Sequence, residues 1–192
     1  DAGAPSLRPH SIFLSASITK PIVAMAAMRL VERGEISLAD HVSGYLPQFS
    51  DSSRRGVTIR HLLTHTSGLP DMLPNNRNLR MSRSPLSSFV EGTCRVALDF
   101  PPGRGVQYQS MGFVLLAAII EKVAGMTLPR YLQQEILAPL QMHDTALGAP
   151  DEWFHPGGKA ERLASVNVPE EQRGGEDWNW NSRYWQARRL TQ

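Results

Sequence analysis

Cysteine is almost absent from this 192-residue chain, and the single Cys94 excludes an intramolecular disulfide. A lone thiol is most often a small buried hydrophobe, and we expect that role here. Long apolar runs are also absent. The longest is FVLLAAII, residues 113–120, whereas a membrane-spanning helix needs about twenty apolar residues. The first ten residues, DAGAPSLRPH, contain no apolar stretch, so we expect neither a transmembrane segment nor a signal peptide within this sequence.

Most of the basic residues are arginines, and they are spread out along the chain. Only three of the 20 are lysines, the formal net charge is +2, and the arginines lie singly apart from the pairs at 54–55 and 188–189. Nucleic-acid-binding domains carry clustered basic residues on one face or along one helix. The charge distribution therefore argues against a nucleic-acid partner.

Motifs of three other protein classes are missing. HLLTH, residues 61–65, places two histidines four apart, as zinc-binding helices do, but no glutamate follows His61 and no third ligand has a suitable spacing. We therefore expect no metal, and we expect His65 to hydrogen-bond the backbone of the turn TSGL. The chain has no Gly-x-Ser-x-Gly elbow, and the loop PPGRGVQ lacks the Gly-Lys-Ser/Thr ending of a phosphate-binding loop. An α/β-hydrolase is disfavoured, and no cofactor is implied.

The chain of 192 residues is long enough for one domain with a full core, and its composition, 41% hydrophobic and 20% charged, is that of a globular protein. Apolar residues recur at three- and four-residue steps over 18–33, where Ser17 is the predicted N-cap and Gly34 the predicted end. Other predicted elements are a strand end at SIFL (11–14), helices over 57–65, 85–98, 110–125 and 128–140, and irregular chain over 71–85. Residues 149–192 hold all four tryptophans and little periodicity, which predicts an irregular segment.

Ser17 and Lys20 lie three residues apart at the start of the predicted helix 18–33. Residues at this spacing share a helix face, with Cβ atoms about 5–6 Å apart, so the lysine amine can reach the serine hydroxyl. A helix N-terminus also favours negative charge. The pair therefore fits a nucleophile beside a proton acceptor. It also fits a capped helix with a surface lysine, because this composition yields such a pair by chance in about one chain in four.

Longer blocks of sequence separate these two interpretations by resemblance. In order, the chain contains SASITKP, LVERGEISLADHVSGYLPQF, VTIRHLLTHTSGLP, FPPGRGVQYQSMGFVLLAAIIEKVAG and ILAPLQMHDTALG. These blocks resemble the serine β-lactamase-related family, which includes class C β-lactamases, DD-peptidases and related esterases. The resemblance covers residues 11–148. It implies an α+β fold of the β-lactamase/DD-peptidase type, represented mainly by its helical lobe.

The resemblance also implies roles for individual residues. Ser17 matches the acylated serine, Lys20 matches the lysine that assists its deprotonation, and Tyr108 matches the tyrosine of the family's Tyr-x-Asn motif, a general base and acid. Without the resemblance, Tyr108 would be read as a buried aromatic with a satisfied hydroxyl. Ser110 stands where the family usually has asparagine, so a shorter hydroxyl takes the substrate-binding position.

The implied activity is that of a serine hydrolase that forms an acyl-serine. Its substrate would be a small-molecule or peptide carbonyl compound, either an ester, a β-lactam or an amide, and the residues do not choose among these. The family makes a periplasmic or secreted location reasonable, while a cytoplasmic one also fits the sequence. The oligomeric state is left open.

One departure from the family pattern bears on activity. The family's third motif, Lys or His followed by Thr or Ser and then Gly, begins at none of the lysines or histidines. In the family this motif lies on a strand that supplies the second oxyanion donor, and losing such a donor costs about 10²–10³ in rate. We therefore expect residues 1–192 to be a partial domain, truncated at both ends, that lacks much of the antiparallel sheet and is weakly active or inactive alone. The alternative is a catalytically incompetent binding or scaffold module.

Overall fold

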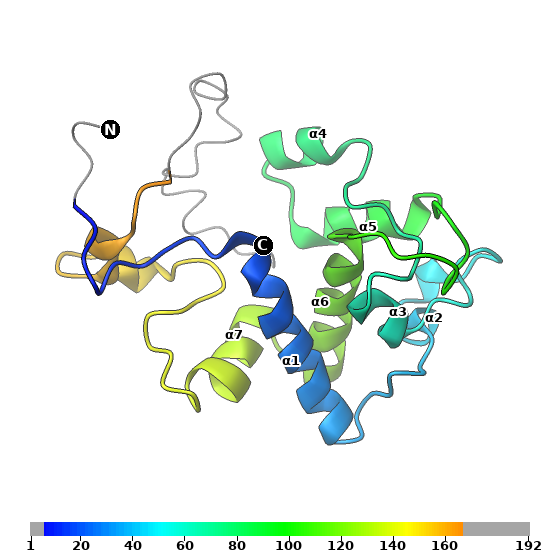
Figure 1. The fold of residues 1–192 in the computed structure, drawn as a ribbon, viewed down its shortest axis with the longest axis horizontal. Coiled ribbons are helices and arrows are strands. Elements are labelled where there is room, and N and C mark those ends of the chain that lie inside the picture. The colour runs from blue at the N-terminus through cyan, green and yellow to red at the C-terminus, as the bar shows by residue number, and fades with distance from the viewer. Residues whose placement is uncertain (1–5, 167–192) are drawn as a thin grey trace.

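The structure is a computed structural model that describes residues 6–166. Its central element is the helix α6 (Met111–Ala124), whose sequence is apolar on nearly every side, as expected of a helix surrounded by others. Figure 1 shows the helices gathered around it. Those that pack against α6 are α1 (Thr19–Glu32), α2 (Val42–Tyr45), α3 (Ile59–Leu63), α5 (Leu86–Arg95) and α7 (Leu128–Leu132).

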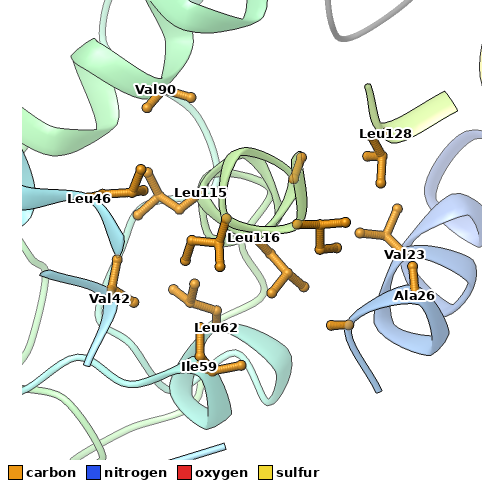
Figure 2. Packing of buried hydrophobic residues seen from close by; sticks show 14 of the residues in the cluster. Val23, Ala26, Val42, Leu46, Ile59, Leu62, Val90, Leu115, Leu116 and Leu128 are labelled. Atoms are coloured by element: carbon orange, nitrogen blue, oxygen red, sulfur yellow. The ribbon is translucent and has the colours of Figure 1, made fainter. Parts of the chain in front are cut away.

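The hydrophobic core follows this arrangement. Leu115, Leu116 and Ile119 of α6 are fully buried. Figure 2 shows the two leucines at the centre of the cluster, with Val23 of α1 on one side and Val42 of α2 on the other. Burying one such side chain contributes about 1.5–3 kcal/mol. The packing of α6 therefore holds the start of α1 and the loop before α6 in a fixed relation.

Short elements complete the described part of the chain. A further helix, α4 (Asn76–Met81), lies next to α5 (Figure 1). Single turns of 3₁₀-helix are η1 (Ala16–Ile18), η2 (Pro47–Phe49), η4 (Asp151–Phe154) and η5 (Lys159–Arg162), and a π-helical turn, η3 (Gln133–Leu137), continues α7. Residues 6–166 contain no β-strand. They contain two isolated bridges, a parallel one between Ile12 and Leu163 and an antiparallel one between His41 and Thr58.

The predicted helices are all present, somewhat shorter than expected. The segment 128–140 is divided into α7 and the π-helical turn η3. The end of α1 at Gly34 is confirmed, because Gly34 has a φ of 70° and donates its N–H to the carbonyl of Val31. Glu35 donates to the carbonyl of Leu30, which completes a Schellman motif.

Three local predictions were wrong. Ser17 is not the N-cap of α1, because it lies inside the preceding turn η1 and its hydroxyl is engaged by other side chains. SIFL forms the single bridge at Ile12 in place of a strand, since its one described partner segment runs beside it only at Leu163. Residues 71–85 contain α4, whose Leu79 packs against the core, so tertiary packing outweighs a weak local pattern.

Other sequence-based expectations concern the end of the chain and membranes. Residues 149–166 are irregular apart from η4 and η5, and the tryptophan-rich remainder, 167–192, lies outside the described residues. No single helix within residues 6–166 has the length and apolar character to cross a membrane. α6 and residues 128–137 meet that criterion only as a pair bent by 75°.

Candidate active site

Ser17 lies in the turn η1, directly before α1 begins at Thr19. The residue before it, Ala16, has a φ of 44°, in the left-handed region that residues with a Cβ rarely adopt. Such a conformation costs on the order of 1 kcal/mol and tends to occur at functional sites. The turn presents Ser17 to solvent at the head of the helix.

Two side chains meet at the hydroxyl of Ser17. The Nζ of Lys20, one helical turn further along, donates to Ser17 Oγ at 3.2 Å. The hydroxyl of Tyr108, from the loop before α6, donates to the same oxygen at 2.7 Å. Lys20 Nζ also lies 4.7 Å from the centre of the Tyr108 ring. The structure therefore brings together the three residues that the sequence analysis named as catalytic.

The charge of Lys20 changes the acidity of the phenol. The pKa of Tyr108 lies below its ordinary value, first because the Lys20 ammonium hydrogen-bonds and stabilises the phenolate, and second because the Ser17 hydroxyl does so. Burial and the carboxylate of Asp71 act in the opposite direction. The site thus favours a phenol that can lose its proton more readily than a free tyrosine.

The loop that carries Tyr108 is held by the turn that follows α3. The Gln107 N–H donates to the carbonyl of His65 at 2.9 Å, and the Gln109 N–H donates to the Nδ1 of His65 at 3.2 Å. The buried Ser67 hydroxyl donates to Gln109 Oε1 at 2.7 Å. These bonds fix the residues on both sides of Tyr108.

Ser110, the fourth residue named by the sequence analysis, lies at the N-cap of α6. Its hydroxyl and its N–H both donate to Oδ1 of Asp71, at 2.7 and 2.8 Å. Since the hydroxyl hydrogen is used in this way, Ser110 presents lone pairs to a ligand, whereas an asparagine amide could also donate. Within the described residues, the side chain of Ser110 hydrogen-bonds Asp71 and neither Ser17 nor Lys20.

The site is open. Ser17 is exposed, Tyr108 is 49% exposed, and Lys20 is partly covered. Within residues 6–166, no three His, Cys, Asp or Glu side chains gather as metal ligands, and His61 instead accepts the Thr58 N–H on its Nδ1. The chemistry that these groups can support is proton transfer at a serine hydroxyl.

Known proteins resemble this chain in sequence and in fold. The Beta-lactamase family model matches residues 1–182. The chain belongs to the Beta-lactamase family. Esterase EstB of Burkholderia gladioli is 39% identical over 159 residues, which are 75% of this chain and 40% of the esterase. Penicillin-binding protein 4* of Bacillus subtilis (strain 168) is 36% identical over 146 residues, 72% of this chain and 31% of that protein.

A solved structure resembles the fold of this Beta-lactamase-family chain. The Beta-lactamase/D-alanine Carboxypeptidase from Yersinia pestis, complexed with citrate, superposes with a TM-score of 0.69 at 27% identity. The match covers 82% of this chain and 45% of that one. The chain therefore spans less than half the length of these relatives.

Sequence reasoning missed the residues that support the Beta-lactamase-family site. It assigned His65 to its own turn, whereas the imidazole contacts the Tyr108 loop. It gave no role to Asp71, Ser67 or Gln109. The available signal was the block VTIRHLLTHTSGLP, which was used for resemblance but not for contacts, because sequence spacing does not reveal which distant loop a turn touches.

Proposed function

We propose that this chain carries the acylation machinery of a serine hydrolase, with Ser17 as nucleophile and with Lys20 and Tyr108 moving its proton. The observation that carries the proposal is the meeting of Lys20 Nζ and the Tyr108 hydroxyl at Ser17 Oγ. A serine hydroxyl attacks carbonyl carbon only when a neighbouring group removes its proton. Here that group would be the Tyr108 phenolate, which Lys20 stabilises.

The acylation step would run as one proton transfer and one substitution. Tyr108, as phenolate, takes the hydroxyl proton of Ser17 while Oγ bonds to the carbonyl carbon of the substrate. The tetrahedral oxyanion then collapses, the bond to the leaving group breaks, and Tyr108 gives the proton to that group. The backbone N–H of Ser17 supplies one of the donors that stabilise the oxyanion.

Deacylation would use the same residues in reverse. Water gives a proton to Tyr108 and attacks the acyl carbon, the bond to Ser17 Oγ breaks, and Oγ regains its proton from Tyr108. Lys20 remains charged throughout and stabilises the phenolate whenever it forms. The net reaction is hydrolysis of the substrate into an acid and an alcohol, an amine or, for a cyclic β-lactam, an opened ring.

The substrate in this proposal is an ester, a β-lactam or an amide. Relatives are named as an esterase and as penicillin-binding proteins, and a serine nucleophile serves all of these carbonyl groups. Ser110 is proposed to contact the substrate through its hydroxyl oxygen, because its hydrogen is directed to Asp71. A hydroxyl in place of an amide would orient the substrate less tightly.

The proposal includes the architecture and the level of activity. The full fold would be α+β, of the β-lactamase/DD-peptidase type, with residues 11–148 forming its helical part and residues 149–192 an irregular extension. Ser17 is exposed in the part of the chain that the structure describes. Electrostatic catalysis is stronger in a site from which water is excluded. We therefore expect slow turnover by residues 1–192 alone.

Adduct mapping tests the proposed function. The chain is incubated separately with a fluorophosphonate and with a labelled penicillin, and each adduct is located by peptide mass spectrometry. Ser17→Ala is the control for the nucleophile, and Ser15→Ala is the matched control for a neighbouring hydroxyl. We expect an adduct at Ser17 that Ser17→Ala alone abolishes. An adduct at another residue contradicts the assignment, and the absence of any adduct favours the binding or scaffold alternative.

A further inference from the structure

We propose that His65 is a positioning residue that holds the phenol of Tyr108 against Ser17 Oγ, and this inference rests on the proposed function of those two residues. Within the described residues, the side-chain contacts of His65 are with Gln109, Tyr108 and Phe113 and not with Ser17, so it would act through Tyr108. The backbone conformation of His65, the contacts of its ring and the protonation state that those contacts require all support this role.

The backbone of His65 sets the direction of its ring. His65 follows the last turn of α3 and has a φ of 59°, in the left-handed region. Histidine, asparagine and aspartate are enriched in that region among residues with a Cβ. The reversal of the chain there turns the imidazole toward the loop before α6, where its ring centre lies 4.8 Å from that of Tyr108 at an angle of 33°.

The imidazole lies among three groups from different elements. Besides Tyr108, it contacts Phe113 of α6, with ring centres 5.5 Å apart. Lys20 Nζ lies over the rings of both Tyr108 and Phe113, at 4.7 and 5.9 Å. His65 therefore packs against the Tyr108 ring, and the Lys20 ammonium that stabilises the phenolate lies in the same cluster. Aromatic pairs of this kind stabilise the folded state by more than the burial of their surface alone.

Hydrogen bonds connect His65 to both neighbours of Tyr108. Its backbone carbonyl accepts the N–H of Gln107 at 2.9 Å, and its Nδ1 accepts the N–H of Gln109 at 3.2 Å. Any residue at position 65 could supply the first bond, but the second needs a side-chain acceptor. The side chain thus contributes a ring contact to Tyr108 and an anchor one residue beyond it.

The anchor requires a neutral imidazole, because a protonated Nδ1 would meet the Gln109 N–H as a second donor. The charged groups that face the ring are Lys20 from α1 and Asp71 from its own turn, and the phenol of Tyr108 lies against it. Burial lowers the pKa of His65, the Lys20 charge lowers it further, and Asp71 opposes them. At neutral pH the acceptor is therefore present, and acid would remove it.

Three variants separate the contributions. His65→Asn tolerates the left-handed backbone and keeps a side-chain acceptor, but it lacks the ring. His65→Gly tolerates the backbone and lacks both. Gln141→Gly is the matched control, because Gln141 has a φ of 55° and lies outside the site. Each variant is checked for folding by urea denaturation before comparison with the unsubstituted chain.

Two measurements follow on each protein. The first is the pKa of Tyr108, obtained from ¹³Cζ-tyrosine NMR titration with Tyr108→Phe to assign the signal. The second is the rate of fluorophosphonate labelling at Ser17 between pH 5 and 9. With His65→Gly we expect the pKa of Tyr108 to rise to about 10, the value of a free tyrosine, and labelling at pH 8 to slow at least tenfold. His65→Asn should recover part of both, and Gln141→Gly should change neither.

The role of His65 and the proposed function can fail separately in these experiments. If the unsubstituted chain does not label at Ser17, the proposed function fails, and the NMR titration still decides the role of His65. A Tyr108 pKa that is unchanged in His65→Gly overturns the inference. Equal losses in His65→Gly and His65→Asn, matched by equal losses of folding stability, overturn it as well, because they indicate a purely structural residue. If His65→Gly does not fold, the pKa and rate in His65→Asn decide, with no change in either counting against the inference.

Discussion

At the scale of single residues, the hydroxyl of Ser17 accepts hydrogen bonds from an ammonium and from a phenol. In the proposed reaction, loss of the Ser17 proton depends on the charge state of Tyr108, and Lys20 is the first cause of the lowered pKa of Tyr108. A site of this kind needs no acidic third member. Its reactivity should respond to any change that moves the Lys20 charge.

Lys20→Met tests that dependence. The pKa of Tyr108 is expected to rise toward about 10, because the largest cause of its lowering is the Lys20 ammonium. A ¹³Cζ-tyrosine NMR titration measures the change. Lys122→Met is the matched control, since Lys122 Nζ donates to the carbonyl of Tyr45, in another part of the molecule. A Tyr108 pKa that is the same in Lys20→Met and in the parent chain would contradict the assigned cause.

At the scale of elements, the turn after α3 and the loop before α6 determine where Tyr108 lies. Gly68 is the tightest point of this contact. It has a φ of 81°, and a Cβ at this position would lie 2.0 Å from the carbonyl oxygen of Phe100, an overlap that requires the backbone to move. The Gly68 carbonyl also accepts the N–H of Asp99 at 2.7 Å. Only glycine allows this approach.

Gly68→Ala is therefore expected to lower the free energy of unfolding by more than about 2 kcal/mol, since backbone strain and a steric clash add together. Gly34→Ala is the matched control. Gly34 also has a left-handed φ, 70°, but nothing lies within 4 Å of a Cβ there, so the expected loss is about 1 kcal/mol from conformation alone. Urea denaturation measures both, and equal losses would refute the close approach at Gly68.

The same elements show what the sequence could predict. Helix α1 follows from apolar periodicity, and the spacing of three residues predicts that Lys20 lies near Ser17. Tyr108 is 91 residues from Ser17 and was named only through resemblance. The hydrogen bonds of His65 and Asp71 with the loop before α6 were not predicted, because they join two irregular segments that carry no periodic pattern.

At the scale of the whole molecule, stability should depend on pH through the partly buried His61 and His65. Burial is the first cause of the lowered pKa values of His61 and His65. A histidine whose pKa is lower in the folded state binds its proton more readily in the unfolded state. As pH falls through about 6.5, the unfolded value, the unfolded state therefore holds more protons than the folded state. Stability is therefore present above that pH and decreases as pH falls through it.

His61→Gln isolates one of these contributions. His61 accepts the Thr58 N–H, while the Thr58 hydroxyl accepts the His61 N–H, which forms a capping box at the start of α3. Glutamine at this position preserves such a box and does not titrate. We expect the free energy of unfolding to fall from pH 7.5 to 6.0 in the parent chain and to fall less steeply in His61→Gln. Equal slopes in urea denaturation would contradict this cause.

The extent of the chain also bears on how the proposed activity is tested. The part that the structure describes holds Ser17, Lys20 and Tyr108, the proposed nucleophile and proton-transfer groups, on an open surface. The chain spans 40% of the related esterase and 31% of the related penicillin-binding protein. Labelling of Ser17 by a strong electrophile is therefore a better test of the site than turnover of a weak substrate.

The most direct test compares the rate of Ser17 phosphonylation in the parent chain with the rates in Tyr108→Phe and Ser17→Ala, followed by intact-mass spectrometry at pH 8. Removing a general base slows a reaction by about 10²–10⁴-fold. The account predicts one adduct per chain, none in Ser17→Ala, and labelling at least about 10²-fold slower in Tyr108→Phe. Labelling of Tyr108→Phe at the parent rate would contradict the claim that the phenol activates Ser17.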